Sequence, residues 1–181
     1  MSPDNTTQLV LVLLGAALAF GTIGWSRNGR AVGPPLSAAA LAAAAVVAAV
    51  SEQLATGRVA TTVLVTLAGT LAVAGGGPVT TRVFAIVDRQ DHDSQTLDAA
   101  GQVLRGGAWI GALERLAVFA GLAAGFPEGV AVVLALKGVG RFQDLRGEAS
   151  GGAATERFII GTFTSVLWAA GCAGIVALVV R

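Results

Sequence analysis

Reactive side chains are scarce in this chain of 181 residues, which contains one cysteine (Cys172), one histidine (His92) and no tyrosine. A single cysteine excludes an intrachain disulfide and any metal site built from several thiolates. The sequence also lacks a Gly-x-Ser-x-Gly elbow and a His-Glu-x-x-His motif, and no histidine lies in a long apolar run. We therefore predict no catalytic residue, no metal and no cofactor, and the sequence favours a protein that is not an enzyme.

Charge is also scarce, because charged residues make up 13% of the chain and hydrophobic residues 54%. A soluble domain is typically about 25% charged, so this excess of apolar surface predicts an all-α membrane protein whose partner is the lipid bilayer. The net charge of +1 provides no basic field for nucleic acid. The basic residues are arginines except for Lys137, and with the abundant Ala, Gly and Val this composition indicates a GC-rich bacterial genome.

Crossing the hydrocarbon core as a helix takes roughly 20 apolar residues. Six segments meet this requirement, at about 7–25, 36–55, 58–74, 106–125, 127–145 and 155–180. We expect one transmembrane domain over 1–181, a multi-pass helical bundle. The second segment is rich in alanine, so whether it spans stays open. The first seven residues carry Asp4 and no basic residue, which favours a retained helix over a signal peptide.

Two polar or broken stretches separate these segments. Gly75 to Pro78 interrupts the third, and beyond it apolar residues recur at helical spacing over 79–89. This pattern favours a short amphipathic helix at the membrane interface, and the alternative is one long kinked helix. The acidic loop 88–98 contains Asp91, His92 and Asp93, which could ligate a divalent metal, although a solvated loop is favoured because a specific site needs more ligands.

Basic residues indicate an orientation, because cytoplasmic loops of membrane proteins carry the excess of Lys and Arg. With six spans and the N-terminus outside, nine basic residues lie on the cytoplasmic side: Arg27, Arg30, Arg82, Arg89, Arg105, Lys137, Arg141, Arg146 and Arg157. Arg58 and Arg181 lie outside. We therefore predict a bacterial cytoplasmic membrane protein with both termini outside.

The fourth and fifth segments are predicted to form a charged hairpin. Gly125-Phe126-Pro127-Glu128 is typical of a tight turn, since glycine suits the position after a helix and proline the first helical turn. Counting back from this turn at about 1.5 Å per residue puts Glu114, Arg115 and Lys137 roughly 15–19 Å deep, near mid-membrane. Charges in lipid usually pair or mark a functional site. The charged cluster that we single out comprises Glu114, Arg115, Lys137, Arg141, Asp144, Glu156 and Arg157.

Glu114 is expected to neutralise Lys137 or Arg141, and Asp144 or Glu156 the remaining bases. Small residues at a spacing of three or four predict close helix packing. These are Gly107, Gly111, Gly121, Gly125, Gly161 and Ser165. From both patterns we expect the last three segments to form the core of the bundle.

Three motifs in this half carry a family resemblance: Gly111-Ala112-Leu113-Glu114-Arg115, Lys137-Gly138-Val139-Gly140-Arg141-Phe142, and Glu156-Arg157 leading into Ile159-Ile160-Gly161-Thr162. Over about 106–174 the chain resembles a group of uncharacterised bacterial inner-membrane proteins. They have an Ile-Gly-x-Leu-Glu-Arg helix, a Lys-x-x-x-Arg-Phe helix and a last helix opening near Ile-Gly-Thr. The resemblance gives weight to the charged residues and implies no activity.

Three functions are compatible with these patterns. The leading hypothesis is a non-catalytic membrane subunit or accessory protein that forms a homo-oligomer or joins a larger complex. The second is a small carrier or binding protein for an anionic or lipidic solute, which would use Arg115, Lys137 and Arg141. The third, an intramembrane enzyme, has the least support because the catalytic patterns are missing.

Overall fold

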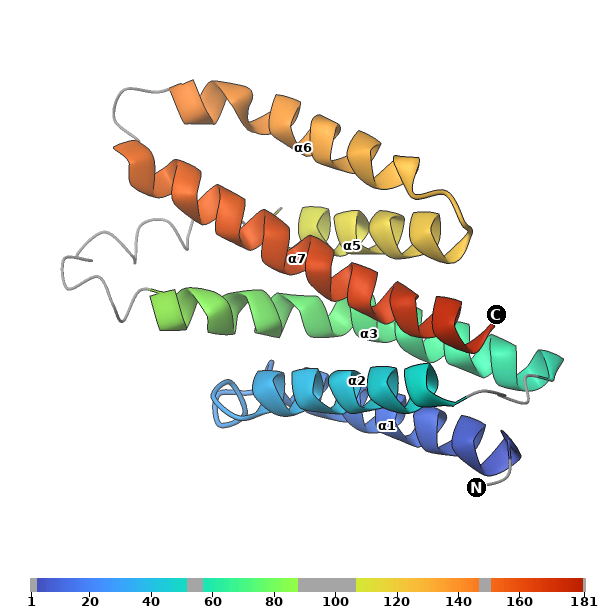
Figure 1. Cartoon of the computed structure of the whole chain (residues 1–181). Helices are drawn as coiled ribbons and strands as arrows, with labels where there is room; N and C mark the ends of the chain where they lie inside the picture. The colour runs from blue at the N-terminus through green and yellow to red at the C-terminus, as the bar shows by residue number, and fades with distance from the viewer. Residues whose placement is uncertain (1–2, 52–56, 88–106, 147–150, 181) are drawn as a thin grey trace.

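The computed structural model describes residues 3–51, 57–87, 107–146 and 151–180, with the backbone alone for 3, 141–146 and 151–154. All secondary structure in these ranges is helical: α1 (Pro3–Ile23), α2 (Gly33–Val50), α3 (Arg58–Val87), α5 (Gly107–Ala123), α6 (Glu128–Arg146) and α7 (Gly151–Val179). Successive helices run in opposite directions, so the chain begins and ends at the same end of the bundle (Figure 1).

Four helices of the described chain are long and apolar enough to cross a membrane. They are α1 from Asp4, α2, α3, and α7 from Thr155. The remaining two differ from them in length or charge, because α5 has 17 residues and α6 includes Lys137, Arg141 and Asp144. The fold is therefore a helical bundle with four candidate spans.

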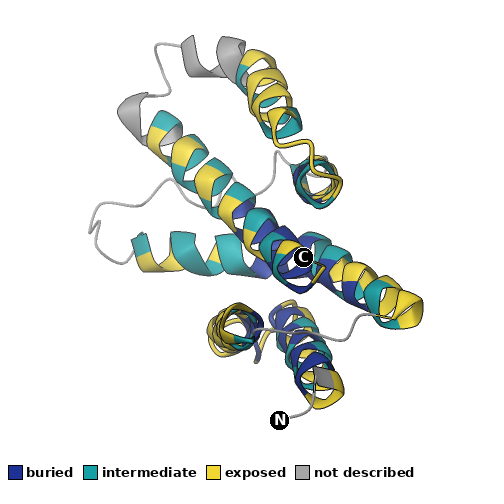
Figure 2. Cartoon of the chain, turned by 45° about the vertical axis from the view of Figure 1, so that its right-hand side comes forward, coloured by how far each residue is buried: buried dark blue, intermediate teal, exposed yellow. Residues whose placement is uncertain are grey.

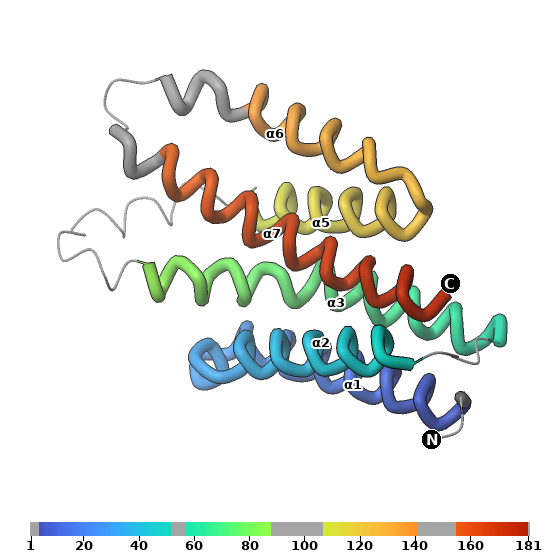
Figure 3. The backbone as a smooth tube through the Cα atoms, viewed as in Figure 1, coloured from blue at the N-terminus to red at the C-terminus, as the bar shows by residue number. Residues whose placement is uncertain are grey.

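Helix α3 is one continuous helix of 30 residues with Pro78 inside it. Figure 3 shows the backbone passing through this region as a single helical path. Residues 79–87, which the sequence favoured as a separate interfacial helix, continue α3, as in the alternative interpretation. At about 1.5 Å per residue the helix is roughly 45 Å long, more than a hydrocarbon core of about 30 Å requires.

The buried core lies where α1, α2, α3 and α7 meet, with α5 at its edge (Figure 2). Small side chains make this close approach feasible, and Ala17, Ala44, Ala68 and Ala169 are all fully buried. A hydrogen bond ties the first two helices together, since Ser37 Oγ in α2 donates to the carbonyl of Ala17 in α1 over 2.7 Å.

The expectation that the last three segments form the core is wrong for α6. None of its described side chains belongs to the buried core, whereas α1, α2 and α3 all contribute to it. The physical reason is that Lys137 is neutralised by Glu114 of α5, so contact with one neighbouring helix satisfies this charge and α6 does not have to lie in the core. Helix α6 instead packs along α5 at the periphery (Figure 1).

Helices α3 and α7 stay together beyond the core. A Cβ atom added at Gly161 in α7 would lie 2.9 Å from the ring of Phe84 in α3, so the two helices are in close contact there. The guanidinium carbon of Arg157 lies 5.6 Å from the centre of the same ring, within the range of a cation–π contact.

Candidate functional site

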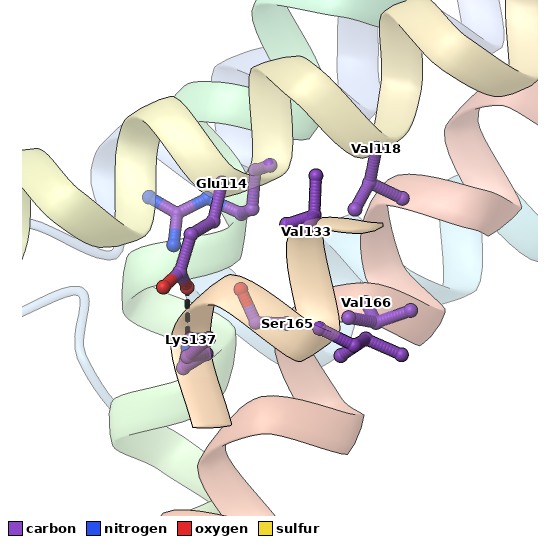
Figure 4. Close-up of a pocket in the computed structure, with 8 residues that line it drawn as sticks. Glu114, Val118, Val133, Lys137, Ser165 and Val166 are labelled. Carbon is purple, nitrogen blue, oxygen red and sulfur yellow. Dashed lines mark hydrogen bonds and ion pairs between the residues drawn. The ribbon is translucent and has the colours of Figure 1, made fainter. Parts of the chain in front are cut away.

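An ion pair joins the two helices of the charged hairpin. Lys137 Nζ in α6 donates to Glu114 Oε2 in α5, and both residues lie near the middle of their helices (Figure 4). The ammonium also lies 5.9 Å from the ring centre of Phe158 in α7. Lys137 is the first of the two partners that the sequence suggested for Glu114. The pair is not sealed in the bundle, because the Lys137 and Glu114 side chains are 21% and 15% exposed.

Arg115, the next residue of α5, reaches from this pair into the bundle and contacts α3. It is 7% exposed. Its Nε and Nη2 atoms donate to the carbonyl of Val73 in α3, over 3.1 and 2.9 Å. A guanidinium has five donors in a rigid fork, so it can hold one carbonyl with two N–H groups. Two adjacent residues of one motif therefore make different contacts. Glu114 joins α5 to α6, and Arg115 joins α5 to α3.

A small cavity lies between α5, α6 and α7, beside the ion pair. It has room for about one water molecule. Its walls combine the charged residues with aliphatic side chains and one serine, as Figure 4 shows. The lining residues are Glu114, Arg115, Val118, Val133, Leu134, Lys137, Ser165 and Val166. One turn earlier on α7, the Thr162 hydroxyl is buried without a hydrogen-bond partner in the described chain.

Pro78 creates a second polar site, at the carbonyl next along α3 from the one that Arg115 binds. Proline has no N–H, so the carbonyl of residue i−4, Ala74, loses its helical donor. The indole N–H of Trp25, which follows α1, donates to this carbonyl over 3.0 Å. Such replacement donors are what allow a proline inside an apolar helix.

Trp168 of α7 makes a related contact one turn earlier. Its indole N–H donates to the carbonyl of Leu71 over 3.1 Å, and the contact is buried. With Trp25 and Arg115, it is the third side chain that donates to the α3 backbone between Leu71 and Ala74. Three separate parts of the chain are thus hydrogen-bonded to one short stretch of α3, which we call the carbonyl site.

The three glycines before Pro78 make room for these side chains. A Cβ atom at Gly75 would lie 2.8 Å from the ring of Trp168, and one at Gly76 would lie 2.7 Å from Arg115 Nε. At Gly77 it would lie 3.0 Å from the ring of Trp25. Each glycine therefore admits a different donor, and the Gly75–Pro78 sequence is a packing surface within a helix.

Two of the other charged residues singled out from the sequence have described side chains, Glu156 and Arg157. Glu156 is exposed on α7. Arg157 lies over the Phe84 ring near the end of α3. The side chains of Arg141 and Asp144 lie outside the described part of the structure, as do Asp91, His92 and Asp93 of the acidic loop.

The small residues divide by their surroundings. Gly161 packs closely against α3, and Ser165 is buried beside the cavity. Gly107 is half-buried, and the nearest atom to a Cβ at Gly111 would be Arg115 Nη1 of its own helix. Gly121 and Gly125 belong to the turn between α5 and α6. Gly121 lies against the carbonyl of Phe126, and Gly125 has a positive φ of 75°.

Sequence reasoning missed Trp25 and Trp168, together with the role of the glycines. One signal was present, because a proline inside an apolar run leaves a carbonyl that needs a donor, and a nearby tryptophan can provide one. Among the described residues, no three His, Cys, Asp or Glu side chains are grouped to hold a metal. Comparisons with models of protein families, curated proteins and solved structures found no match to this chain.

Proposed function

We propose that this chain is a non-catalytic subunit or accessory protein of a bacterial cytoplasmic membrane, which associates with itself or joins a larger membrane complex. In this proposal α5 and α6 span the membrane together with the four longer helices, and both termini lie outside. The resemblance of 106–174 to bacterial inner-membrane proteins supports the location, and the arrangement of basic residues supports the orientation.

The observation that carries the proposal is the partly exposed ion pair of Glu114 and Lys137. Its members lie near the middle of two helices that we take to be membrane spans. A charged side chain at the bilayer centre costs about 2.5–3.5 kcal/mol on insertion scales. A second polypeptide over this edge of the bundle would remove the pair from lipid and lower that cost.

The proposal is tested by the mass of the particle extracted from its native membrane with a lipid-retaining polymer. Native mass spectrometry should give a mass well above the 18.0 kDa of one chain. Replacing Glu114 and Lys137 by Gln and Met should reduce the associated fraction, whereas Glu128→Gln, at the start of α6, should leave it unchanged. A particle that contains one chain and no partner in the native membrane would refute the proposal.

Orientation has its own test. In a Cys172→Ala background, single cysteines replace Asn28, between α1 and α2, or Phe126, between α5 and α6; both residues are exposed. A membrane-impermeant maleimide should label position 126 in intact cells and position 28 only after permeabilisation. The reverse pattern would overturn the predicted orientation, and equal labelling of both sites in intact cells would contradict the six-span arrangement.

A second candidate function is a binding protein for a small anionic solute. The cavity beside Arg115, Lys137 and Ser165, with the unpartnered Thr162 hydroxyl one turn away, supports this alternative. Its volume fits only a ligand of about the size of water. Calorimetric titration with chloride tests the idea, and binding unchanged by Lys137→Met would count against it.

A further inference from the structure

We propose that the cavity between α5, α6 and α7 is a binding site for one internal water molecule, held by the Ser165 hydroxyl and the ion pair of Glu114 and Lys137. Such a water joins α7 to the charged hairpin. The inference goes beyond the proposed function, because it concerns the inside of one chain and does not require a partner.

The first argument is the unused hydroxyl of Ser165. This side chain lines the cavity and is 7% exposed, and its hydroxyl has no hydrogen bond to the described chain. A serine or threonine in a helix can donate to the carbonyl four residues earlier. The threonines of α3 that do so are Thr62, Thr66, Thr70, Thr80 and Thr81. Because a buried hydroxyl without a partner is costly, Ser165 needs a partner from outside the chain.

The second argument is the unused hydrogen-bonding capacity of the ion pair. An ammonium has three donors, and a carboxylate accepts several hydrogen bonds. In the described chain the Lys137 ammonium has one hydrogen bond, to Glu114, and both residues line the same cavity as Ser165. Figure 4 shows the Ser165 oxygen on the side of the cavity where the ion pair lies, with the labelled valines on the other side. The polar groups therefore converge on one part of the cavity.

A second hydroxyl on the same face of α7 extends this polar surface. Phe158, Thr162 and Ser165 are spaced by four and three residues, so they lie on one side of the helix. Phe158 contacts the Lys137 ammonium and Ser165 lines the cavity, which places Thr162 between them. The Thr162 hydroxyl is buried without a partner in the described chain. Two unused hydroxyls therefore lie on the side of α7 that faces the hairpin.

Size and chemistry select water as the ligand. The cavity has room for about one water molecule, and an internal water usually has about three polar partners. An occupant that satisfies all three groups accepts a hydrogen bond from the ammonium and donates one to the carboxylate, and water does both. A chloride ion only accepts, and it would meet the carboxylate of Glu114. Arg115 also lines the cavity, but two of its N–H groups are bound to the carbonyl of Val73.

Water contact at Lys137 tests the site directly, because this residue is the only lysine of the chain. Solid-state NMR of the full chain in lipid bilayers, with ¹⁵N in lysine and tryptophan, gives one lysine side-chain signal. Transfer of magnetisation from water to this signal should exceed the transfer to the indole N–H of Trp168, which is buried and bound to the carbonyl of Leu71. A transfer to Lys137 no greater than that to Trp168 would overturn the inference.

Substitution of Ser165 distinguishes the cavity from the open edge of the ion pair, where the Lys137 side chain is 21% exposed. Ser165→Val removes the hydroxyl and adds methyl groups that fill the cavity, so the water transfer to Lys137 should be lost. Thr164→Val is the matched control, because Thr164 is the adjacent residue and does not line the cavity. It should leave the transfer unchanged. If Ser165→Val retains the full transfer, water reaches Lys137 from the open edge and the inference is wrong.

A crystallographic map of the unaltered protein, grown in bromide, makes the test independent of the folding of any variant. A solvent peak within hydrogen-bond distance of Ser165 Oγ and the ion pair, without a bromide signal, supports the inference. A bromide signal there overturns the water assignment and supports the anion-binding alternative. A Ser165 hydroxyl bonded to the carbonyl of Gly161, with no peak in the cavity, also overturns it. None of these outcomes depends on the number of chains in the particle, so the proposed subunit role stands if this inference fails.

Discussion

Replacing Gly76 with alanine should weaken the contact of α3 with α5. The new Cβ atom would lie 2.7 Å from Arg115 Nε and 3.1 Å from Cδ1 of Trp168. Real Cβ atoms essentially never approach other heavy atoms within 3.0 Å. Either the guanidinium must leave the carbonyl of Val73, or α5 must move away from α3.

The magnitude follows from comparing these two routes. Forcing an extra methyl into a packed interior typically costs about 1–3 kcal/mol, and losing a hydrogen bond to a charged group costs about 1.5–3 kcal/mol. The protein takes the cheaper route, so the cost stays near 1–3 kcal/mol. Alanine is better than glycine in a helix by about 1 kcal/mol, which offsets part of this cost. We expect Gly76→Ala to lower the free energy of unfolding by up to about 2 kcal/mol.

Reversible unfolding in bicelles with added detergent, followed by tryptophan fluorescence, measures this change. Gly15→Ala in α1 is the matched control, because a Cβ there would meet no atom within 4 Å. It should be neutral or stabilising by up to about 1 kcal/mol. The second control repeats Gly76→Ala in an Arg115→Ala chain, where part of the obstruction is gone and the cost should fall.

Two results would refute this reasoning. If Gly76→Ala is as stable as Gly15→Ala, the approach of Arg115 to α3 does not require a glycine. If the cost of Gly76→Ala is the same with and without the Arg115 side chain, the clash lies elsewhere. After either result, the Gly75–Pro78 sequence could no longer be explained as a surface that admits the Arg115 side chain.

Three further substitutions test other contacts by the same unfolding measurement. Trp25→Phe should lower the free energy of unfolding by about 1–3 kcal/mol, because the Ala74 carbonyl loses its donor. This loss should be smaller in a Pro78→Ala chain, which restores a helical N–H. Equal losses in both chains would contradict this role of Trp25. Gly125→Ala should cost about 1–2 kcal/mol, since an L side chain is strained at positive φ, and an unchanged stability would exclude that turn conformation. Gly161→Ala should lower the free energy of unfolding by up to about 2 kcal/mol, because its contact with an aromatic ring of α3 outweighs the better helix propensity of alanine; a stabilised variant would contradict that contact.

Local patterns were sufficient to predict that the chain is helical and where one turn lies. Gly125 and Pro127 lie between two apolar runs. In the structure α5 ends just before them and α6 begins just after them. The positive φ of Gly125 is the reason that glycine suits this position. Features of this kind depend on neighbours in sequence, so they are visible without a structure.

The carbonyl site could not be predicted in this way. A proline in an apolar run looks like a break until its donor is known, and Trp25 lies 49 positions from the carbonyl that it serves. Trp168 lies 97 positions from the carbonyl of Leu71. Pairing at such distances depends on which helices become neighbours, and periodicity within one helix contains no information about that choice.

The position of α6 is hard to predict for a related reason. Its charged residues suggest an inward face, and the alanine-rich second segment is by sequence the weakest candidate for a span. The structure reverses their roles, because α2 contributes Leu41, Ala44 and Ala48 to the core and α6 contributes no described residue. In a membrane, small side chains that allow close contact select the core more than hydrophobicity does.

The order in which the carbonyl site is completed follows the direction of synthesis. Trp25 precedes α3 in the chain, so the Ala74 carbonyl can be satisfied as soon as α3 is made. Arg115 and Trp168 come later, and α7 is the last of these helices to leave the ribosome. Until then the set of partners that packs against Gly75 and Gly76 is incomplete. The arrival of α7 therefore completes the carbonyl site. A nascent chain stopped before α7 lacks the Trp168 contact with α3.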